Sequence, residues 1–503
     1  DCDGDGIPNF KDADACDSDG DGINDIDEDT GGDGDPNNDD CDGDDVPNEE
    51  DNCAADANAN QEDDDDNGVG NACENDTGTR ARDFSDCYQA QLITAPATAL
   101  HECTWNNHAH ALQRQLDANT PMKESLWLAS HNSYNYPQPQ QPSTTDPNQF
   151  IDLTAQFDLE MRAVEIDIHW MESPLCSGNL QPLVCHSQGD HSTCSGTELN
   201  SDVHFNTIND WLDANPGEFV QVDIESNFGV NRALPCPPGV PEPTGGDPFD
   251  VVGMQLATIF GDKLYSPVDS GSEQLPLEVT RAQMLGAGRQ VIATGNFNNA
   301  WKDIVHGLDV RSQHVYDDAT VTYPGCEWFP LSDYRNRWTR MWEDSTNVGT
   351  AFVPDAEPVG DADLIEMLRC GLNNPSLDKI TSSDSRLASS IWSWAESEPA
   401  VNAEANCAVH TAEGRFVSAD CSASHGYACT TDGGQNWVIV SAAGGHSGGA
   451  AACSALSPSN SFEVPQTGYF NQRLRDAKAS AGVTTVWVNY AEDENVEGRW
   501  SSP

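Results

Sequence analysis

The middle of the chain contains short apolar runs that each end at polar or charged residues. The run at 163–170 alternates strictly, so Glu165, Asp167 and His169 share one face while the valine and isoleucines between them share the other. This alternation is typical of a half-buried β-strand. Further short apolar runs indicate strands at 126–129, 183–185, 219–224, 290–295, 340–344, 390–394 and 484–489.

Apolar residues at helical spacing lie between or before some of these runs. The segment 205–212 has this spacing and is followed by the stop signal Asn215-Pro216-Gly217, and a second helical run spans 109–116. Strands that alternate with helices predict an α/β fold with a parallel sheet. A strand count that approaches eight indicates a (β/α)8 barrel of the TIM type, regular or irregular. In such barrels the active site lies at the carboxyl ends of the strands.

Polar side chains follow three of these runs at the predicted carboxyl ends. His131 and Asn132 follow the first run, His186 follows the run at 183–185, and Glu225 follows the run at 219–224. Because the carboxyl ends of parallel strands meet at one edge of a sheet, we expect these side chains to lie close together. Each histidine taken alone could equally make a structural hydrogen bond.

Carboxylates inside a barrel strand are costly unless they are paired or bind a metal. One explanation for Glu165 and Asp167 is a solvated strand end, where they bond to a neighbouring arginine or to the backbone. The other is a metal site, because Asn132 and Glu225 would complete a set of oxygen ligands. An all-oxygen set suits Ca²⁺ better than a transition metal, since Zn²⁺ prefers nitrogen or sulfur.

The order of these residues along the chain resembles the X half of calcium-dependent phosphatidylinositol-specific phospholipase C. The matching positions, in chain order, are His131-Asn132, Glu165-x-Asp167, His186 and Glu225. The resemblance implies that His131 and His186 are catalytic and that Asn132, Glu165, Asp167 and Glu225 bind one catalytic Ca²⁺. Either Glu165 or Asp167 would accept a proton. The asparagine after the first histidine favours the metal-dependent branch of that family.

The first 76 residues are dominated by Asp and Glu and contain a single basic residue, Lys11. Their composition alone would predict disorder, but Asp-x-Asp-x-Asp-Gly loops recur, in which alternate side chains converge on one cation. The segment from Asp51 through Asn60-Gln61 to Cys73 resembles a thrombospondin type 3 repeat, which wraps around several structural calcium ions. The expected ligands in this region are Asp17, Asp19, Asp21, Asp25, Asp42, Asp44, Asp63 and Asp65.

Three regions follow from these patterns. We expect calcium-binding repeats over 1–76, a linker and barrel-closing helix over 77–120, and the catalytic barrel over 121–503. A Cys-rich segment at about 395–460 would interrupt the barrel before its last strand. This segment is similar to the second half of a C-type lectin domain, but Ala400 stands where the lectin calcium motif needs Asn, so we interpret it as a disulfide-pinned insertion. Cys326 and Cys370 would tie a late loop.

Composition narrows the cellular setting and the partners. The net charge of −61 disfavours nucleic acid as a partner, and the 17 cysteines without a zinc-type cluster favour an oxidising, secreted or cell-surface location. No apolar run is long enough to span a bilayer. The chain starts at Asp1 inside a repeat, so we interpret it as a processed product.

The favoured function is cleavage of phosphatidylinositol at a membrane surface that the enzyme contacts transiently. The inositol 2-hydroxyl would attack the phosphate, releasing diacylglycerol and a cyclic inositol phosphate. Two alternatives stay open: a glycerophosphodiester phosphodiesterase, and a non-catalytic secreted calcium-dependent adhesive protein. The first alternative family follows its first histidine with Arg-Gly, whereas this chain has Asn132-Ser133.

Overall fold

A computed structural model describes most of the chain after residue 104. The described residues are 105–137, 147–172, 179–187, 194, 198–229, 246–307, 310–314, 325–327, 336–344, 358–399, 406–493 and 496–501. They form two compact units. One comprises Gln113–Trp392 and Gln466–Gln472, and the other contains Ser393–Pro465 and Arg473–Pro503. The expected repeats over 1–76, with their eight aspartate ligands, lie outside the described residues.

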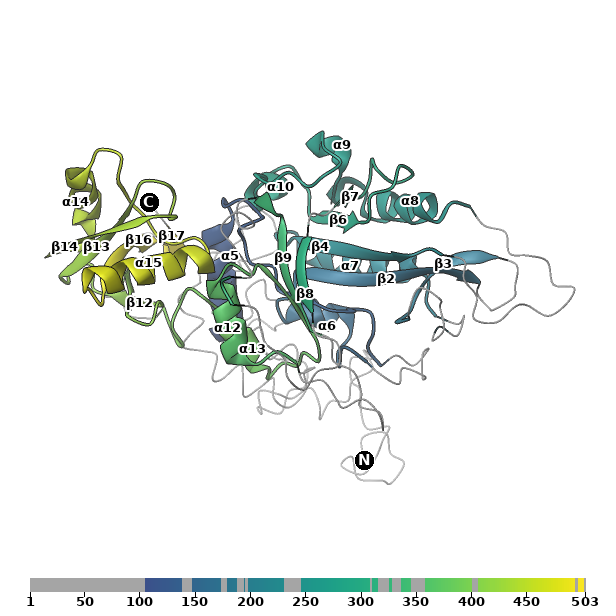
Figure 1. Cartoon of the computed structure of the whole chain (residues 1–503), viewed down its shortest axis with the longest axis horizontal. Helices are drawn as coiled ribbons and strands as arrows, with labels where there is room; N and C mark the ends of the chain where they lie inside the picture. Colours follow the sequence, from purple (N-terminus) through teal and green to yellow (C-terminus); the bar gives the residue numbers. More distant parts are fainter. Residues whose placement is uncertain are drawn as a thin grey trace, which may run out of the picture. The chain divides into compact units, whose positions relative to one another are not determined.

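The first unit is built on a curled, mainly parallel sheet (Figure 1). Eight parallel strands follow one another in the order β5–β6–β4–β2–β1–β10–β9–β8. Their bounds are β1 (Ala129–Ser130), β2 (Ala163–Glu172), β4 (Val220–Asn227), β5 (Leu264–Tyr265), β6 (Val291–Gly295), β8 (Val310–His314), β9 (Thr339–Glu343) and β10 (Asn374–Leu377). The first strand in the chain, β1, pairs in parallel with β2 on one side and with β10, the last strand of this sheet, on the other, as the first and last strands do in a TIM-type barrel.

Helices connect the strands, and some begin at side-chain caps that the sequence supplies. Asn200 accepts a hydrogen bond from the backbone of Asp202 at the start of α7, and Asp247 does the same for α8, which has proline at its first position. The helices that the structure describes between Leu153 and Ser389 are α6 (Leu153–Asp158), α7 (Ser201–Ala214), α8 (Pro248–Phe260), η2 (Gly261–Lys263), α9 (Pro267–Ser270), α10 (Arg281–Gly286), α12 (Asp361–Arg369) and α13 (Ser385–Ser389).

The alternation along β2 divides its side chains between two environments. Val164, Ile166 and Ile168 belong to the apolar core that also contains residues of α7 and α8. Ala163 faces the other way and packs in a second cluster with Trp127 of the chain before β1. The face that carries Ala163 also carries Glu165 and Asp167, so the barrel interior is apolar at the amino ends of the strands and becomes acidic toward their carboxyl ends.

The predicted helix at 109–116 is present as α5 (Trp105–Asp117). Arg114, in its last turn, pairs with Glu160 and with Glu218, which precede β2 and β4. Arg162 also pairs with Glu218, at 2.8 Å. These ion pairs hold the last turn of α5 near the amino ends of β2 and β4, and a barrel-closing role for this helix stays a prediction.

One expected barrel strand has a different role. The run at 183–185 falls in β3 (Leu180–Val184), which pairs antiparallel with the second half of β2. The prediction of a parallel barrel strand there is wrong, because the chain turns back after β2 and forms a hairpin instead of crossing over through a helix. A short strand that was not predicted, β7 (His306–Gly307), pairs in parallel with β6.

The end of the barrel also differs from the prediction. Residues 390–394 are not a strand, and the strand beside β1 is β10, which was missed. The run at 484–489 overlaps β16 (Val486–Asp493), which belongs to the sheet of the second unit. The segment 395–460 is therefore not an insertion between two barrel strands, because its own strands pair with β16.

The second unit has a seven-stranded sheet of its own with the central order β12–β11–β16–β13–β14. Its other strands are β11 (Cys407–His410), β12 (Phe416–Ala419), β13 (His425–Thr430), β14 (Trp437–Gly444), β15 (Ser461–Phe462) and β17 (Val496–Ser501). The remaining helices among the described residues are η3 (His446–Gly448), α14 (Gly449–Leu456) and α15 (Gly468–Ala481). Disulfides Cys407–Cys421 and Cys429–Cys453 cross-link the second unit, as the Cys-rich pattern led us to expect.

Two further expectations concern covalent and membrane features. The bond between Cys326 and Cys370 is present, so the prediction of a tied late loop is confirmed. Among the helices of the described residues, none combines the length and the apolar character that crossing a bilayer requires.

Candidate active site

The turn after β1 carries the first two candidate residues. His131 and Asn132 follow Ser130 directly, and Asn132 adopts the left-handed backbone conformation with φ of 46°, which asparagine tolerates better than most residues. Main-chain hydrogen bonds hold this turn between its neighbours: the amide of His131 donates to Leu377 O and that of Ser133 donates to Glu165 O. The turn is therefore fixed by both strands that flank β1.

Three carboxylates meet at the carboxyl ends of β2 and β4. The parallel register sets Asp167 directly opposite Glu225, and Glu165 lies two residues earlier on the same face of β2. One carboxylate oxygen from each of Glu165, Asp167 and Glu225 lies within 4.8 Å of the others. The backbone amide of Asn132 donates to Oε2 of Glu165 at 3.2 Å, which brings the fourth predicted ligand residue next to this cluster.

The carboxylates are crowded in a place that disfavours their charge. Burial, followed by the charge of Glu343, raises the pKa of Glu165 well above its ordinary value, and burial with the charge of Glu225 does the same for Asp167. Burial also raises the pKa of the neighbouring Asp223 to about 6. A cation among these groups would remove the repulsion and let them ionise.

The donor set fits a calcium ion. Oδ1 of Asp167 is buried and has no hydrogen-bond partner among the described residues, whereas Oδ2 accepts from the hydroxyl of Tyr134 at 2.9 Å. The same hydroxyl lies 3.0 Å from Oδ1 of Asn132, so the amide oxygen is close to the carboxylates. Glu165, Asp167, Glu225 and Asn132 thus offer only oxygen ligands, the set that Ca²⁺ prefers.

His131 lies between carboxylates on both sides of its ring. Its Nδ1 is 3.0 Å from Oδ1 of the fully buried Asp378, and its Nε2 is 3.6 Å from Glu343 and 3.9 Å from Glu165. Burial alone would lower the pKa of His131, but the contact with Asp378 and the charges of Glu343 and Glu165 raise it well above its ordinary value. Asp378 orients the ring as the aspartate does in a Ser-His-Asp triad.

His186 reaches the site from the hairpin. It follows Cys185 just after β3, and its Nδ1 lies 3.3 Å from Nδ2 of Asn135, a residue of the turn after β1. Asn135 in turn donates to Asn148 at 2.6 Å, and Asn148 donates to Asp378 at 3.2 Å. The two predicted catalytic histidines therefore belong to one hydrogen-bonded group.

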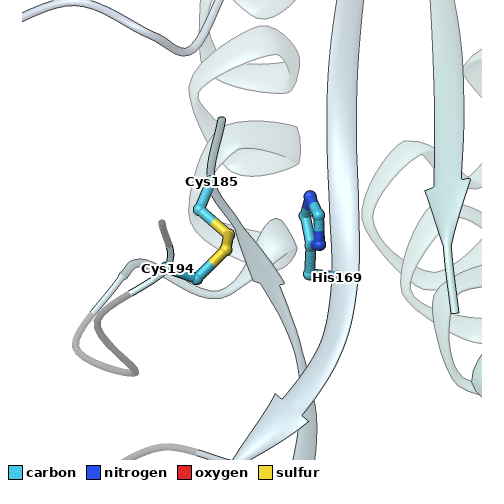
Figure 2. Close-up of side chains that lie close together, drawn as sticks. All are labelled: His169, Cys185 and Cys194. Carbon is cyan, nitrogen blue, oxygen red and sulfur yellow. A yellow bond between two sulfur atoms is a disulfide. The ribbon is translucent and has the colours of Figure 1, made fainter. Parts of the chain in front are cut away.

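A different cluster beside β2 looks like a metal site but is a disulfide. His169 lies next to Cys185 and Cys194, and Figure 2 shows the bond between the two sulfur atoms. Sulfurs joined in a disulfide are not thiolate ligands. The bond instead ties the chain immediately before His186 to a residue nine positions later.

The sequence located six residues that the fold brings together: His131, Asn132, Glu165, Asp167, His186 and Glu225. It missed Asp378 and Glu343, which follow or end strands late in the chain. Glu343 lies within the predicted run at 340–344 and is the last residue of β9, so its place at a carboxyl end could have been noticed. Asp378 follows Asn-Pro-Ser-Leu, a strand that has neither alternation nor β-branched residues, and nothing local marks it.

Comparisons with known proteins agree with part of this description. A family model described as "Rv2075c PI-PLC-like domain" matches residues 88–238, a stretch that includes all six predicted residues. The proteins named Uncharacterized protein Rv2075c and Uncharacterized protein MT2135, from two strains of Mycobacterium tuberculosis, are each 28% identical over 429 residues, which is 80% of this chain and 82% of theirs.

Solved structures were also found. A phosphatidylinositol-specific phospholipase C from S. aureus is 11% identical with a TM-score of 0.38, covering 58% of this chain and 97% of that one. A calcium-dependent phosphoinositol-specific phospholipase C from Pseudomonas sp is 15% identical with a TM-score of 0.33, covering 55% and 93%.

Proposed function

We propose that this protein is a calcium-dependent phosphodiesterase that cleaves phosphatidylinositol on the glycerol side of its phosphate. The observation that carries the proposal is the position of the His131–Asp378 pair, whose Nε2 lies 3.9 Å from a carboxylate of the three-carboxylate cluster. An oriented imidazole beside a calcium-type ligand set is suited to phosphoryl transfer. The PI-PLC-like family match over 88–238 supports this class of substrate.

The reaction needs no covalent intermediate with the protein. The inositol 2-hydroxyl would form the new bond to phosphorus, the bond from phosphorus to the glycerol oxygen would break, and the products would be a cyclic inositol phosphate and diacylglycerol. The proton that the hydroxyl loses balances the proton that diacylglycerol gains. Ca²⁺, when bound by the oxygen ligands, would lower the pKa of the hydroxyl and offset negative charge on the phosphoryl group.

The geometry suggests a role for each protein group. Glu165 is the better candidate for the proton acceptor, because Asp167 already accepts from Tyr134 and faces Glu225. His131 would act on a phosphoryl oxygen through Nε2, which lies 3.0 Å from Nδ2 of Asn132, while Asp378 holds Nδ1. His186 would face the departing glycerol oxygen.

We also propose an extracellular location and calcium-bound repeats at the amino end of the chain. Four disulfides among the described cysteines indicate an oxidising environment, where such bonds persist. Modest calcium affinity is typical of extracellular modules, so calcium outside the cell would saturate Asp-rich loops of this kind. Substrate would be met transiently at a membrane surface.

The test is release of water-soluble inositol phosphate from vesicles of phosphatidylinositol and phosphatidylcholine, with calcium and with chelator. We expect turnover with calcium only, and a loss of roughly 10² to 10⁴ in kcat for His131→Ala and for His186→Ala. Glycerophosphoinositol serves as a second substrate: if it is hydrolysed and the vesicles are not, the activity is that of a glycerophosphodiester phosphodiesterase. No turnover of either substrate would leave the adhesive alternative.

A further inference from the structure

Two buried amides connect the two histidines of the site. His131 Nδ1 lies 3.0 Å from Asp378 Oδ1, and Asp378 Oδ2 accepts from Asn148 Nδ2 at 3.2 Å. Asn148 Oδ1 accepts from Asn135 Nδ2 at 2.6 Å, and the same Nδ2 lies 3.3 Å from Nδ1 of His186. Asn135, Asn148 and Asp378 are all at most 5% exposed, so each must satisfy its polar atoms within the protein.

The negative charge of Asp378 sets the direction of each hydrogen bond between Asp378 and His186. An amide can be turned by 180°, which exchanges its oxygen and nitrogen, so a neighbour of fixed polarity must decide its orientation. Asp378 is that neighbour, because its carboxylate is paired with His131 and can only accept. Asn148 must therefore present Nδ2 to Asp378, which leaves Oδ1 for Asn135.

The same logic continues to His186. Asn135 must present Nδ2 to Oδ1 of Asn148, and the second hydrogen of that nitrogen then points to Nδ1 of His186. A ring nitrogen that receives a donor must itself be unprotonated. A neutral imidazole has one N–H, so in the neutral form of His186 the proton is on Nε2, on the opposite side of the ring.

We propose that Asn135 and Asn148 are positioning residues that hold His186 in the tautomer with its proton on Nε2. The inference rests on the proposed function for the role of His186, because it makes Nε2–H the donor that faces a substrate oxygen. It also refines that role. An imidazole whose Nδ1 accepts a hydrogen bond is a fixed hydrogen-bond donor at Nε2, and stabilises negative charge on the departing oxygen in that way.

The direct test is the ¹⁵N NMR spectrum of the histidine side chains in the full chain at neutral pH. The His186 resonances are assigned by their loss in His186→Ala. We expect an unprotonated Nδ1 and a protonated Nε2 in the wild type. Asn135→Asp replaces the donor by a carboxylate of nearly the same shape that can only accept, so Nδ1 of His186 should become protonated. A protonated Nδ1 in the wild type, or an unchanged His186 in Asn135→Asp, would overturn the proposal.

Asn148→Leu supplies a second variant and Gln149→Leu a matched control. Asn148→Leu removes the link that sets the orientation of Asn135, so both His186 tautomers should appear. Gln149 is equally buried and follows in sequence, but its Nε2 bonds main-chain oxygens of His131 and Leu377, so its replacement should leave the tautomer unchanged. The same tautomer change in Gln149→Leu would show general loosening of the site and would refute the positioning role of Asn135 and Asn148.

Activity provides the second measurement. Asn135→Asp and Asn148→Leu should lower kcat on phosphatidylinositol vesicles about tenfold or more while KM changes less than about threefold, because the effect lies in the transition state. A rise in KM with unchanged kcat would contradict a positioning role. The NMR measurement does not depend on turnover. An inactive wild type with the expected tautomer would therefore refute the proposed function but not the positioning of His186 by Asn135 and Asn148.

Discussion

Asp378 Oδ1 lies 3.0 Å from Nδ1 of His131, although 247 positions separate the two residues in the sequence. The contact exists because β10 and β1 are neighbours in the curled sheet, with Leu377 paired to Ser130 in register. His131 and Asp378, which directly follow Ser130 and Leu377, are the two partners in this hydrogen bond. A buried carboxylate in this position fixes the ring and the tautomer of His131.

Asp378→Asn should therefore lower kcat by roughly 10² to 10⁴ while KM changes little, because the amide no longer enforces Nδ1–H on His131. Steady-state kinetics on phosphatidylinositol vesicles measures both constants. Thermal unfolding of the same variant separates a folding defect from a catalytic one. Activity within a few-fold of wild type, in a folded variant, would remove Asp378 from the site.

The metal requirement should depend on the three-carboxylate cluster. Glu225→Gln should raise the calcium concentration for half-maximal activity about tenfold or more, because one charged ligand is lost. Asp223→Asn is the matched control on β4. Its side chain bonds Thr294 at 2.9 Å, and it is not among the proposed ligands, so the calcium requirement should stay within a few-fold. Equal calcium curves for Glu225→Gln and wild type would contradict the assigned site.

The disulfide beside His186 should matter for activity. The double substitution Cys185→Ser with Cys194→Ser should lower kcat at least several-fold, because the chain before His186 is no longer tied (Figure 2). Cys407→Ser with Cys421→Ser breaks a bond of the second unit and serves as the control, for which kcat should be unchanged. The kcat values of the two folded variants are compared at the same calcium concentration. An equal loss of kcat in both would indicate a general effect on folding and would contradict a specific role for the bond beside His186.

The unphosphorylated head group should be preferred. The strand β6 carries no lysine, and Arg289, which precedes it, is paired with Asp269 at 2.8 Å. Extra ring phosphates would bring negative charge toward three carboxylates. We expect phosphatidylinositol to be cleaved at least tenfold faster than its bisphosphate at equal surface concentration, a difference of about 1.4 kcal/mol. The opposite preference would direct attention to Lys379, the residue after Asp378.

Acid should remove the stabilisation that Glu218 provides. Burial alone would raise its pKa, but Arg114 and Arg162 hold the pKa of Glu218 well below its ordinary value of 4.5. A carboxylate whose pKa is lower in the folded than in the unfolded chain stabilises the fold at pH values above its ordinary pKa. This stabilisation is lost as the pH falls from the ordinary pKa toward the lowered one.

At neutral pH, Glu218→Gln should therefore cost about 1–2 kcal/mol and lower Tm by a few degrees. The difference in Tm between variant and wild type should shrink as the pH falls from 6 to 3. Calorimetry across this range measures it, and a difference that is constant with pH would exclude the charge of Glu218 as its cause.

The sequence alone determined the local features of this protein. The alternation at 163–170 depends only on which residues follow one another, so it predicted β2 and the shared face of Glu165 and Asp167. The positions of His131 and Glu225 after apolar runs followed in the same way. The α/β barrel could be predicted because several such strands alternate with helices.

The tertiary structure decided everything that depends on which strands become neighbours. β10 has a proline and no apolar alternation, so its propensity is weak, and it is a strand because β1 and β9 flank it. The run at 484–489 is a good strand by the same local criteria, yet it pairs within the second unit. Pairing depends on contacts between distant segments, and a local pattern holds no information on these. For that reason Asp378 and the amides that connect His131 to His186 could be recognised only in the folded chain.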